Sequence, residues 1–322
     1  MQEEGARVPQ SAPFRVVVLG AGAIGLSFAA AFEDAGAAVT LADPDAARRE
    51  AGPQGLAVQR EAIALAGLTR NGGGSVTVVP SAEAAVGSAD LVLECGPENV
   101  ETKRAIFAEL LAHTGPRTVL ATASSAIAMS HIVEDGTAQA RCLVAHPINP
   151  PAVLRVVELV PAPGTSPATM ARAEAIFADA GFAAVRLGHE IEGFVLNRLQ
   201  GAILREAYRL VDEGVTDVAG IEAGFRLGLG PRWAFSGPFE TAELNTPGGI
   251  VAHAARMGPA YRRMGEARGE TVDWRPDLVA RVAAERRAVL PEDRIPARVA
   301  WRARAVARLV AARDRLLGDA DD

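Results

Sequence analysis

A histidine and a glutamate stand out in the stretch VAHPINPPAVLRVVELVP, which runs from Val144 to Pro161. His146 ends an apolar run just before a proline-rich loop, and Glu158 lies inside the next apolar run. Imidazole exchanges a proton near neutral pH, which suits a general base. A carboxylate on a neighbouring strand would hold the ring in one tautomer and stabilise the imidazolium. Two other interpretations stay open: His146 as a hydrogen-bonded structural histidine, and Glu158 as a solvent-facing residue of an edge strand.

A glycine-rich turn follows the first predicted strand, RVVVLG, and opens a helical stretch. Its residues are Gly20, Ala21, Gly22, Ala23, Ile24 and Gly25, which have GxGxxG spacing. The first glycine permits a tight turn, the second lets a pyrophosphate approach, and the third lets helix and strand pack closely. Asp43 closes the next strand, where a carboxylate binds the adenosine ribose and repels a 2′-phosphate. The pattern predicts that these residues bind NAD, while Arg48 and Arg49 leave NADP open.

Polar side chains also follow two later predicted strands, whose carboxyl ends face the ligand crevice of a parallel sheet. Glu98 and Lys103 lie in the first turns of the helix after DLVLEC. Either side chain would reach the nicotinamide ribose or the pyrophosphate, or the two would belong to a solvated helix start. Thr122, Ser124 and Ser125 follow RTVLAT. Their hydroxyls would donate to a substrate oxygen or cap the next helix, and for Ser124 and Ser125 the cap is favoured.

Strands and helices alternate along the first part of the chain, which predicts a mostly parallel, doubly wound sheet. The expected strands are RVVVLG, AVTLAD, SVTVV, DLVLEC, RTVLAT, RCLVAH, VVELV and AAVRLG, with helices between them, including one at 126–134. From residue 191 onward apolar residues recur at helical spacing, ending in a long amphipathic helix at 298–317. We expect an α/β, Rossmann-type domain at 14–190 after a flexible leader at 1–13, followed by an all-α domain at 191–322.

The composition limits the classes of partner and compartment. The chain has 322 residues, 49% of them hydrophobic, and a net charge of −6, which gives no reason to expect nucleic acid or an anionic membrane as a partner. Cys95 and Cys142 lie in apolar runs and are predicted to be buried free thiols in a reducing compartment. No Cys/His cluster predicts a metal site, and neither a signal peptide nor a membrane span is evident. These features favour a cytoplasmic protein.

The motifs in combination resemble the 3-hydroxyacyl-CoA dehydrogenase superfamily, over nearly the whole chain. They are GAGAIG with Asp43, PENVETK, HPINPP, VVELVP and EGFVLNRL. Longer stretches resemble its L-gulonate 3-dehydrogenase, or lambda-crystallin, branch: AHPINPPAVLRVVELVPAPGTSPAT, GFVLNRLQGAILREAYRLVDEG and GLGPRWAFSGPFETAELN. The resemblance implies NAD-dependent oxidation of a 3-hydroxy acid to a 3-oxo acid, by a homodimer joined through the helical domain. The roles that it implies are base for His146, orienting partner for Glu158, substrate ligand for Asn197, neighbour of the nicotinamide for Asn149, and cofactor contacts for Glu98 and Lys103.

Two departures from the family pattern bear on the substrate. The family usually has serine where Thr122 aligns, and the added methyl affects substrate fit or rate; Ser124 is the alternative donor. The segment at 44–75 is shorter than the helical hairpin that contacts CoA in the fatty-acid enzymes, which argues against an acyl-CoA substrate. We expect a small, L-gulonate-like 3-hydroxy acid. Arg232 is a candidate ligand for its carboxylate, or else a helix-terminal or interface arginine.

Three alternatives to this function stay open. Two have the same fold and chemistry: a 3-hydroxyacyl-CoA dehydrogenase and a carnitine dehydrogenase. The third is of another class, a non-catalytic NAD(H)-binding protein with a structural or sensing role. The combination of His146, Glu158 and Asn197 argues against the third.

Overall fold

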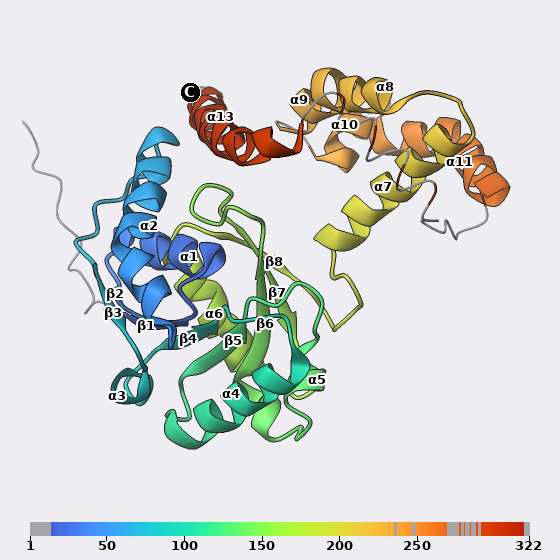
Figure 1. Cartoon of the computed structure of the whole chain (residues 1–322). Helices are drawn as coiled ribbons and strands as arrows, with labels where there is room; N and C mark the ends of the chain where they lie inside the picture. The colour runs from blue at the N-terminus through green and yellow to red at the C-terminus, as the bar shows by residue number, and fades with distance from the viewer. Residues whose placement is uncertain are drawn as a thin grey trace, which may run out of the picture. The chain divides into compact units, whose positions relative to one another are not determined.

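The computed structural model describes residues 14–234, 237–246, 249–268 and 291–318, with the single positions 277, 280, 284 and 288. The leader predicted at 1–13 lies outside these residues. Internal contacts divide the chain into two units, each described here by itself (Figure 1). Unit 1 comprises Met1–Arg198 and Arg302–Ala312, and unit 2 comprises Leu199–Trp301 and Arg313–Asp322. The domain limits predicted at 14–190 and 191–322 stay predictions.

Unit 1 is built on an eight-stranded sheet in the order β3-β2-β1-β4-β5-β6-β7-β8. Neighbouring strands are parallel, with the exception of the antiparallel pair β6 and β7. The strands are β1 (Arg15–Leu19), β2 (Ala38–Ala42), β3 (Ser75–Val79), β4 (Leu91–Glu94), β5 (Val119–Thr122), β6 (Cys142–Pro147), β7 (Val156–Pro161) and β8 (Ala183–Arg186). The sheet confirms the predicted Rossmann-type α/β fold.

Helices cover both faces of the sheet, because successive strand residues point to opposite sides. Val16 and Val18 pack in one core with apolar residues of α1 (Ala23–Asp34), α2 (Ala46–Leu65) and α6 (Pro167–Asp179). Val17 packs in the other core with residues of α3 (Glu83–Val86), α4 (Val100–His113) and α5 (Met129–Ile132). The two layers hold the strands rigidly, so the side chains at the strand ends have fixed positions.

The helix expected at 126–134 is much shorter than predicted. Only Met129–Ile132 is α-helical, and a 3₁₀ segment, η1 (Ala138–Arg141), leads into β6. The Ser124 hydroxyl oxygen accepts the N–H of Ile127 at 2.8 Å. The chain therefore forms a turn there before the helix begins, since a serine side chain competes with the backbone for such N–H groups.

The described part of unit 2 contains helices and no strand, as expected from its periodicity. They are the rest of α7 (Leu196–Asp212), α8 (Val218–Ala223), the π-helical η2 (Gly224–Leu229), α9 (Gly230–Trp233), α10 (Pro238–Leu244), α11 (Gly249–Arg268), the 3₁₀ segment η3 (Glu292–Arg294) and parts of α13 (Ile295–Gly318). In α13, Ala307 and Val310 belong to unit 1, where they pack with Ala66 and Val153. None of the helices within the described ranges is long and apolar enough to cross a membrane.

Candidate active site

The carboxyl ends of adjacent parallel strands bring most of the predicted site residues to one edge of the sheet. Leu19, the last residue of β1, pairs with Glu94 at the end of β4. Glu94 pairs with Thr122 at the end of β5, and Thr122 pairs with Val144 of β6. His146 follows Val144 on the same strand, and the glycine-rich turn follows Leu19. In open parallel sheets this edge is where ligands bind.

The glycine-rich turn has the shape that a pyrophosphate needs. Gly20 has a φ of +106°, and a Cβ there would lie 2.8 Å from the carbonyl oxygen of Cys95. A side chain at Gly25 would collide with the carbonyl of Gly20. Gly22 is the N-cap of α1 and has no side chain to occupy the N–H groups of the first turn. Those groups and the positive end of the helix dipole are available to an anion.

Asp43 supports this turn from the end of β2. Its carboxylate is buried and accepts the N–H of Ala21 at 2.8 Å and the N–H of Asp45 at 2.9 Å. A carboxylate has lone pairs beyond these two bonds, so it can also accept ribose hydroxyls. The guanidinium of Arg48 lies 3.8 Å from the same carboxylate. The turn, the helix start and the acid together fit the adenine dinucleotide that the sequence predicts.

His146 and Glu158 face each other across the antiparallel pair β6 and β7. The two residues are directly paired in register, and Nδ1 of the imidazole lies 2.6 Å from Oε2 of the carboxylate. Both side chains are buried, Glu158 completely. β7 lies between β6 and β8, which excludes the solvent-facing edge position considered for Glu158. An ionised carboxylate accepts hydrogen bonds, so it holds the proton on Nδ1 and leaves Nε2 free to act on a ligand.

The other carboxylate oxygen of Glu158 holds the start of α7. Oε1 accepts the N–H of Val195 at 2.7 Å and the N–H of Leu196 at 3.0 Å. Burial alone would raise the pKa of Glu158, but the hydrogen bonds from His146 and from these two N–H groups outweigh it and lower the pKa. A carboxylate at a helix N-terminus is also stabilised by the helix dipole. One buried acid therefore joins the histidine to the beginning of α7.

Phe194 completes the surroundings of His146. Its side chain is 1% exposed, and its ring centroid lies 5.5 Å from that of the imidazole. Phe194 has a φ of +50°, and the preceding Gly193 has a φ of +76°. Left-handed backbone is costly for an aromatic residue, so the surrounding contacts must hold it in place. The aromatic ring and the Glu158 carboxylate together fix the orientation of the imidazole.

A second buried acid, Glu94, was not recognised from the sequence. It is fully buried, and its carboxylate accepts the ammonium of Lys103 at 2.7 Å, the hydroxyl of Thr122 at 2.6 Å and the N–H of Gly96 at 2.6 Å. Its signal in the sequence is an acid at the carboxyl end of the apolar strand DLVLEC. These bonds satisfy a charge that would be very costly to bury alone.

Lys103 is the only lysine of the chain; every other residue among its 33 Lys and Arg is an arginine. Its side chain is 1% exposed, and its ammonium also lies 3.7 Å from Glu98. A compact ammonium fits such an enclosed position, whereas a planar guanidinium needs more room. The ammonium is enclosed by protein, and its direct contact with the cofactor stays a prediction. Lys103 acts on the site through Glu94 and Glu98.

The expected substrate donors, Thr122 and Ser124, have their hydroxyl protons committed elsewhere. Thr122 donates to Glu94, and Ser124 donates to Glu98. Donation by either of them to a substrate oxygen stays a prediction. Ser125 differs: it is exposed, and its hydroxyl contacts no polar group of the described residues. The sequence had placed it in the same hydroxyl cluster but favoured a capping role.

Glu98 fixes the loop that follows β5. Besides the Ser124 hydroxyl, it accepts the N–H groups of Ser125 and Ala126, each at 3.1 Å. Burial would raise its pKa, but these hydrogen bonds and the charge of Lys103 together lower it. Its neighbour Asn99 caps α4 by accepting the N–H of Thr102 at 2.9 Å. Glu98 thus shapes the site, and its contact with a cofactor stays a prediction.

Three predicted site residues remain, Asn197, Asn149 and Arg232, and each lies in a different part of the structure. The Asn197 side chain, in the first turn of α7, donates to the carbonyl of Ser125 at 2.9 Å, which brings it to the hydroxyl cluster. Asn149 is exposed in the loop after β6. Arg232 is exposed on α9 of unit 2, and its role as a substrate ligand stays a prediction. Among the described residues no group of three His, Cys, Asp or Glu could hold a metal ion.

Comparison with protein families agrees with this site. The NAD-binding domain of 3-hydroxyacyl-CoA dehydrogenase matches residues 15–191, and the C-terminal domain of the same enzyme matches residues 193–288. The chain therefore belongs to the 3-hydroxyacyl-CoA dehydrogenase family, as its motifs predicted. It is an NAD-dependent oxidoreductase that acts on CH–OH groups, and NAD as the cofactor is confirmed.

Individual relatives extend over most of the chain. The lambda-crystallin homolog of Bos taurus is 35% identical over 314 residues, which cover 95% of this chain and 98% of the relative. L-Carnitine dehydrogenase of Streptomyces griseus is 36% identical over 250 residues, which cover 76% of this chain and 74% of the relative. Among solved structures, the chain resembles 5-formyl-3-hydroxy-2-methylpyridine 4-carboxylic acid 5-dehydrogenase, an NAD⁺-dependent dismutase. The TM-score is 0.77 at 24% identity, and the match covers 93% of this chain and 99% of that one, so the two share the fold. The predicted likeness to the lambda-crystallin branch is confirmed.

Proposed function

We propose that the protein oxidises the 3-hydroxyl group of a small, L-gulonate-like 3-hydroxy acid to the 3-oxo acid, with His146 as the general base. The observation that carries this proposal is the buried pair of His146 and Glu158 at the sheet edge that also carries the glycine-rich turn. Oxidation of an alcohol requires removal of the hydroxyl proton, and an imidazole with Nε2 free is suited to accept it. When bound, NAD supplies the acceptor for the hydride.

Each neighbouring side chain has a proposed part in this step. His146 takes the substrate proton on Nε2, and Glu158 stabilises the resulting imidazolium through its 2.6 Å contact with Nδ1. Ser125 donates a hydrogen bond to the substrate oxygen, because its hydroxyl is the one of its cluster that is not engaged within the described residues. Asn197 binds the substrate beside it, since its amide nitrogen is already anchored to the Ser125 carbonyl. The glycine-rich turn and Asp43 hold NAD, with Glu98 and Asn149 next to the nicotinamide.

The arrangement between β2 and β3 favours a free acid over a CoA thioester. A single helix, α2, and a glycine-containing loop connect these strands. The family resemblance places a helical hairpin that contacts CoA at this point in the fatty-acid enzymes. The relative from Bos taurus, which matches this chain almost from end to end, is a lambda-crystallin homolog. L-Carnitine dehydrogenase is also a relative, and carnitine is therefore the second candidate substrate.

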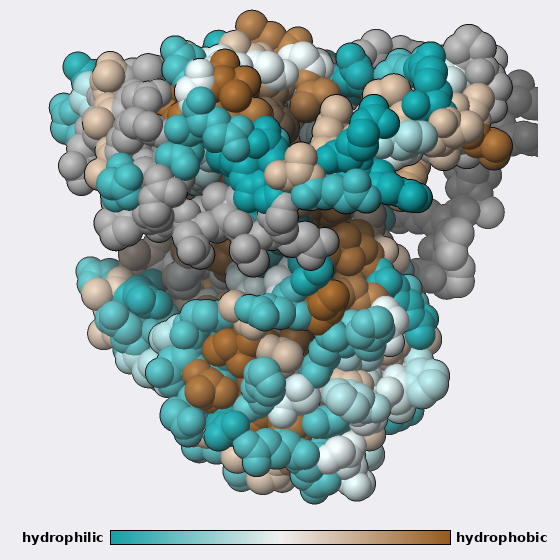
Figure 2. Space-filling model, turned by 90° about the vertical axis from the view of Figure 1, so that its right-hand side faces the viewer, coloured by the Kyte–Doolittle hydropathy of each residue, from teal (hydrophilic) through white to brown (hydrophobic). Residues whose placement is uncertain are grey.

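The helical unit is proposed to form a homodimer and to supply substrate contacts, including Arg232 to a carboxylate. Apolar side chains on α7 support the dimer: Leu199 is 55% exposed, and Ile203 and Leu204 are partly exposed. Figure 2 shows further apolar surface on this unit. Phe239, on α10, is 81% exposed. Exposed apolar surface of this extent is typical of protein interfaces. The free thiols of Cys95 and Cys142 agree with a cytoplasmic location.

A panel of free 3-hydroxy acids, carnitine and 3-hydroxybutyryl-CoA, assayed with NAD by the absorbance of NADH, tests the proposal. We expect the highest kcat/KM with a polyhydroxylated free acid. Faster turnover of the CoA ester or of carnitine would assign the corresponding alternative. Binding of NADH without turnover of any of these compounds would favour a non-catalytic role. Ser125→Ala should lower kcat, whereas Ser130→Ala, outside the cluster, should not.

A further inference from the structure

A polar hollow lies at the amino end of the sheet, away from the glycine-rich turn. Its volume is about 200 Å³, and it is lined by the start of β1, by the loops before β4 and β5 and by α6. Arg15, the first residue of β1, contributes to it, whereas the glycine-rich turn follows the last residue of that strand. A strand rises about 3.3 Å per residue, so the two sites are roughly 15 Å apart along β1. The hollow belongs entirely to unit 1.

Positive charge dominates this hollow. Three guanidinium groups line it, those of Arg15, Arg117 and Arg172, together with one carboxylate, that of Asp90. Asp90 accepts the backbone N–H of Arg15 at 2.9 Å and the guanidinium of Arg172 at 2.6 Å, so both of its oxygens are engaged. The side chains of Arg15 and Arg117 make no ion pair with any described residue. Within the described residues, two positive charges are therefore left without a counter-charge.

One hydrogen-bond donor at the hollow lacks an acceptor among the described residues. Nε of Arg172 is buried and has no acceptor among the described residues. Thr118 donates its hydroxyl to the carbonyl of Ala89 at 2.8 Å, and Ser88 donates to Ala85 at 3.3 Å. These two hydroxyl protons are thus already used within the protein, whereas the Nε–H of Arg172 remains without an acceptor among the described residues. A ligand that brings oxygen atoms and negative charge would satisfy both the charge and the donors.

The walls of the hollow are held by the first hydrogen bonds of the sheet. The N–H of Asp90 donates to Arg15 at 2.9 Å, and the N–H of Val119 donates to Asp90 at 3.0 Å. The N–H of Thr118 closes the preceding loop by donating to Gly115 at 3.1 Å. Asp90 in turn fixes Arg172. A ligand would therefore meet a preformed wall, with only the exposed ends of Arg15 and Arg117 left to order.

We propose that this hollow is a binding site for a phosphate-type oxyanion, separate from the dinucleotide site. A water molecule occupies about 30 Å³, so the hollow has room for a phosphate group with a few waters. Guanidinium groups match the geometry and charge of such an anion. The anion is either inorganic phosphate or the phosphate group of a small phosphomonoester. The proposal does not depend on the proposed substrate or on His146.

Calorimetric titration of the full-length protein tests this site, with NADH present at saturation so that the dinucleotide site is blocked. Ionic strength is kept constant with chloride, and the titrants are inorganic phosphate and glycerol 3-phosphate. We expect saturable binding of one anion per chain, weakened at least tenfold in Arg117→Gln and further in the double variant Arg15→Gln/Arg117→Gln. Arg186→Gln is the matched control: it removes an exposed arginine of unit 1 that pairs with Glu174 and should bind phosphate like the wild type.

The two titrants distinguish the source of the anion: tighter binding of glycerol 3-phosphate assigns the site to a phosphomonoester, and tighter binding of phosphate assigns it to the inorganic ion. The Kd of NADH, measured by its fluorescence, should be the same in all variants. The proposal is overturned if phosphate does not bind saturably once NADH is bound. It is also overturned if Arg117→Gln binds phosphate as tightly as Arg186→Gln does.

Discussion

Two buried carboxylates at the same edge of the sheet bind partners of different chemistry. Glu94, at the end of β4, is fully buried and binds the ammonium of Lys103 and the hydroxyl of Thr122. Glu158, on β7, is equally buried and binds an imidazole and two backbone N–H groups. An ammonium keeps its proton near neutral pH, whereas an imidazole exchanges it. The first network thus serves as a fixed support, and the second is suited to proton transfer.

The contrast shows that burial and hydrogen bonding alone do not identify a catalytic acid. Glu94 has as many partners as Glu158, and both lie close to the predicted ligand. The chemistry of the partner separates them, together with access: His146 keeps a free ring nitrogen, whereas Lys103 is enclosed. Substitutions at Glu94 and Lys103 should therefore affect mainly stability, and substitutions at His146 mainly kcat.

The largest effect is expected when the ion pair between Lys103 and Glu94 is broken. Lys103→Met leaves the Glu94 charge buried without its counter-charge, which costs about 3–5 kcal/mol of unfolding free energy. Lys103→Arg should also destabilise the protein, by about 1–3 kcal/mol, because the enclosed position has no room for a guanidinium. Urea denaturation at neutral pH measures both changes.

The double variant Glu94→Gln/Lys103→Met provides the control for that prediction. It removes both charges and should recover much of the lost stability, since a buried pair replaced as a whole is often close to neutral. It remains informative if Lys103→Met does not fold. A double variant as unstable as Lys103→Met would contradict the ion-pair explanation.

The next effect concerns catalysis. His146→Gln should lower kcat by roughly a hundredfold or more, because a general base contributes about 10²–10⁴-fold to the rate. The affinity for NADH should stay unchanged, since the imidazole is expected to act on the substrate. Steady-state kinetics and NADH fluorescence measure the two quantities. Turnover retained within a few fold would exclude His146 as the base.

A smaller effect follows from the lowered pKa of Glu158. A group whose pKa is lower in the folded state stabilises the protein above its unfolded pKa, near 4.3 for glutamate, and loses this contribution as the pH falls. Glu158→Gln should therefore cost roughly 1.5–3 kcal/mol at neutral pH, the usual contribution of charge-assisted hydrogen bonds. The difference from the wild type should shrink in acid. The loss should begin near the unfolded pKa and become complete only below the lower pKa of the folded state, so a difference that stays constant through this acid range would argue against an ionised Glu158.

The smallest effect is expected at Phe194, which positions His146 without reacting. Phe194→Leu keeps an apolar side chain and should cost less than about 1.5 kcal/mol of stability. The looser imidazole should lower kcat several fold while the KM for NAD is unchanged. Phe107→Leu, in the same core but not against the imidazole, is the matched control and should leave kcat unaltered. Equal kcat losses in the two variants would show that Phe194 has no positioning role.

The sequence predicted the features that depend on local patterns. The glycine spacing with Asp43 predicted the dinucleotide turn, because only glycine tolerates the φ of Gly20 and the close approach at Gly25. The pairing of His146 with Glu158 was also predictable, since two apolar strands joined by a short loop bring the residues opposite each other.

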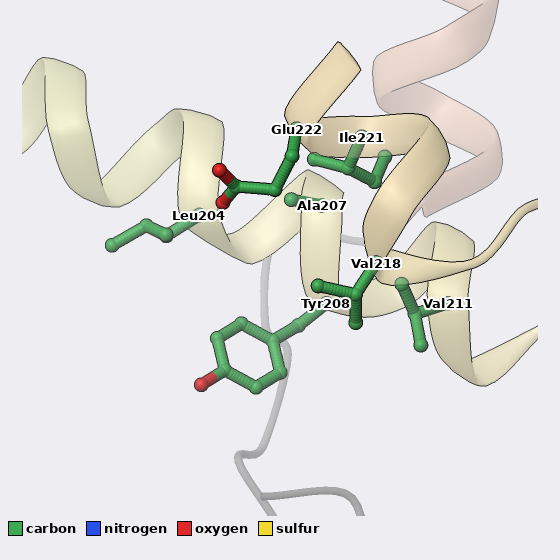
Figure 3. A pocket seen from close by; sticks show the side chains of 7 residues that line it. All are labelled: Leu204, Ala207, Tyr208, Val211, Val218, Ile221 and Glu222. Atoms are coloured by element: carbon green, nitrogen blue, oxygen red, sulfur yellow. The ribbon is translucent and has the colours of Figure 1, made fainter. Parts of the chain in front are cut away.

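Other features depend on contacts that the sequence order does not contain. Lys103 reaches Glu94 because α4 packs against the sheet, and this packing is a tertiary property. The choice among Thr122, Ser124 and Ser125 depends on where the acceptors Glu94 and Glu98 lie. The helices of unit 2 could be predicted from periodicity, but their packing could not. α7 and α8 line an open, mostly apolar pocket of about 260 Å³, and Glu222 and Tyr208 are among its lining residues (Figure 3).

Because the single lysine is buried, proteolysis at that residue can measure unfolding of the chain. A protease that cuts only after lysine has one possible site in the entire sequence, and that site is enclosed in α4 of the native protein. Cleavage therefore requires opening of unit 1, and its rate follows the population of the open state when reclosing is fast. Bound NAD should slow the cut by the factor by which it stabilises the closed state. The appearance of two fragments on a gel would then measure cofactor binding without a label.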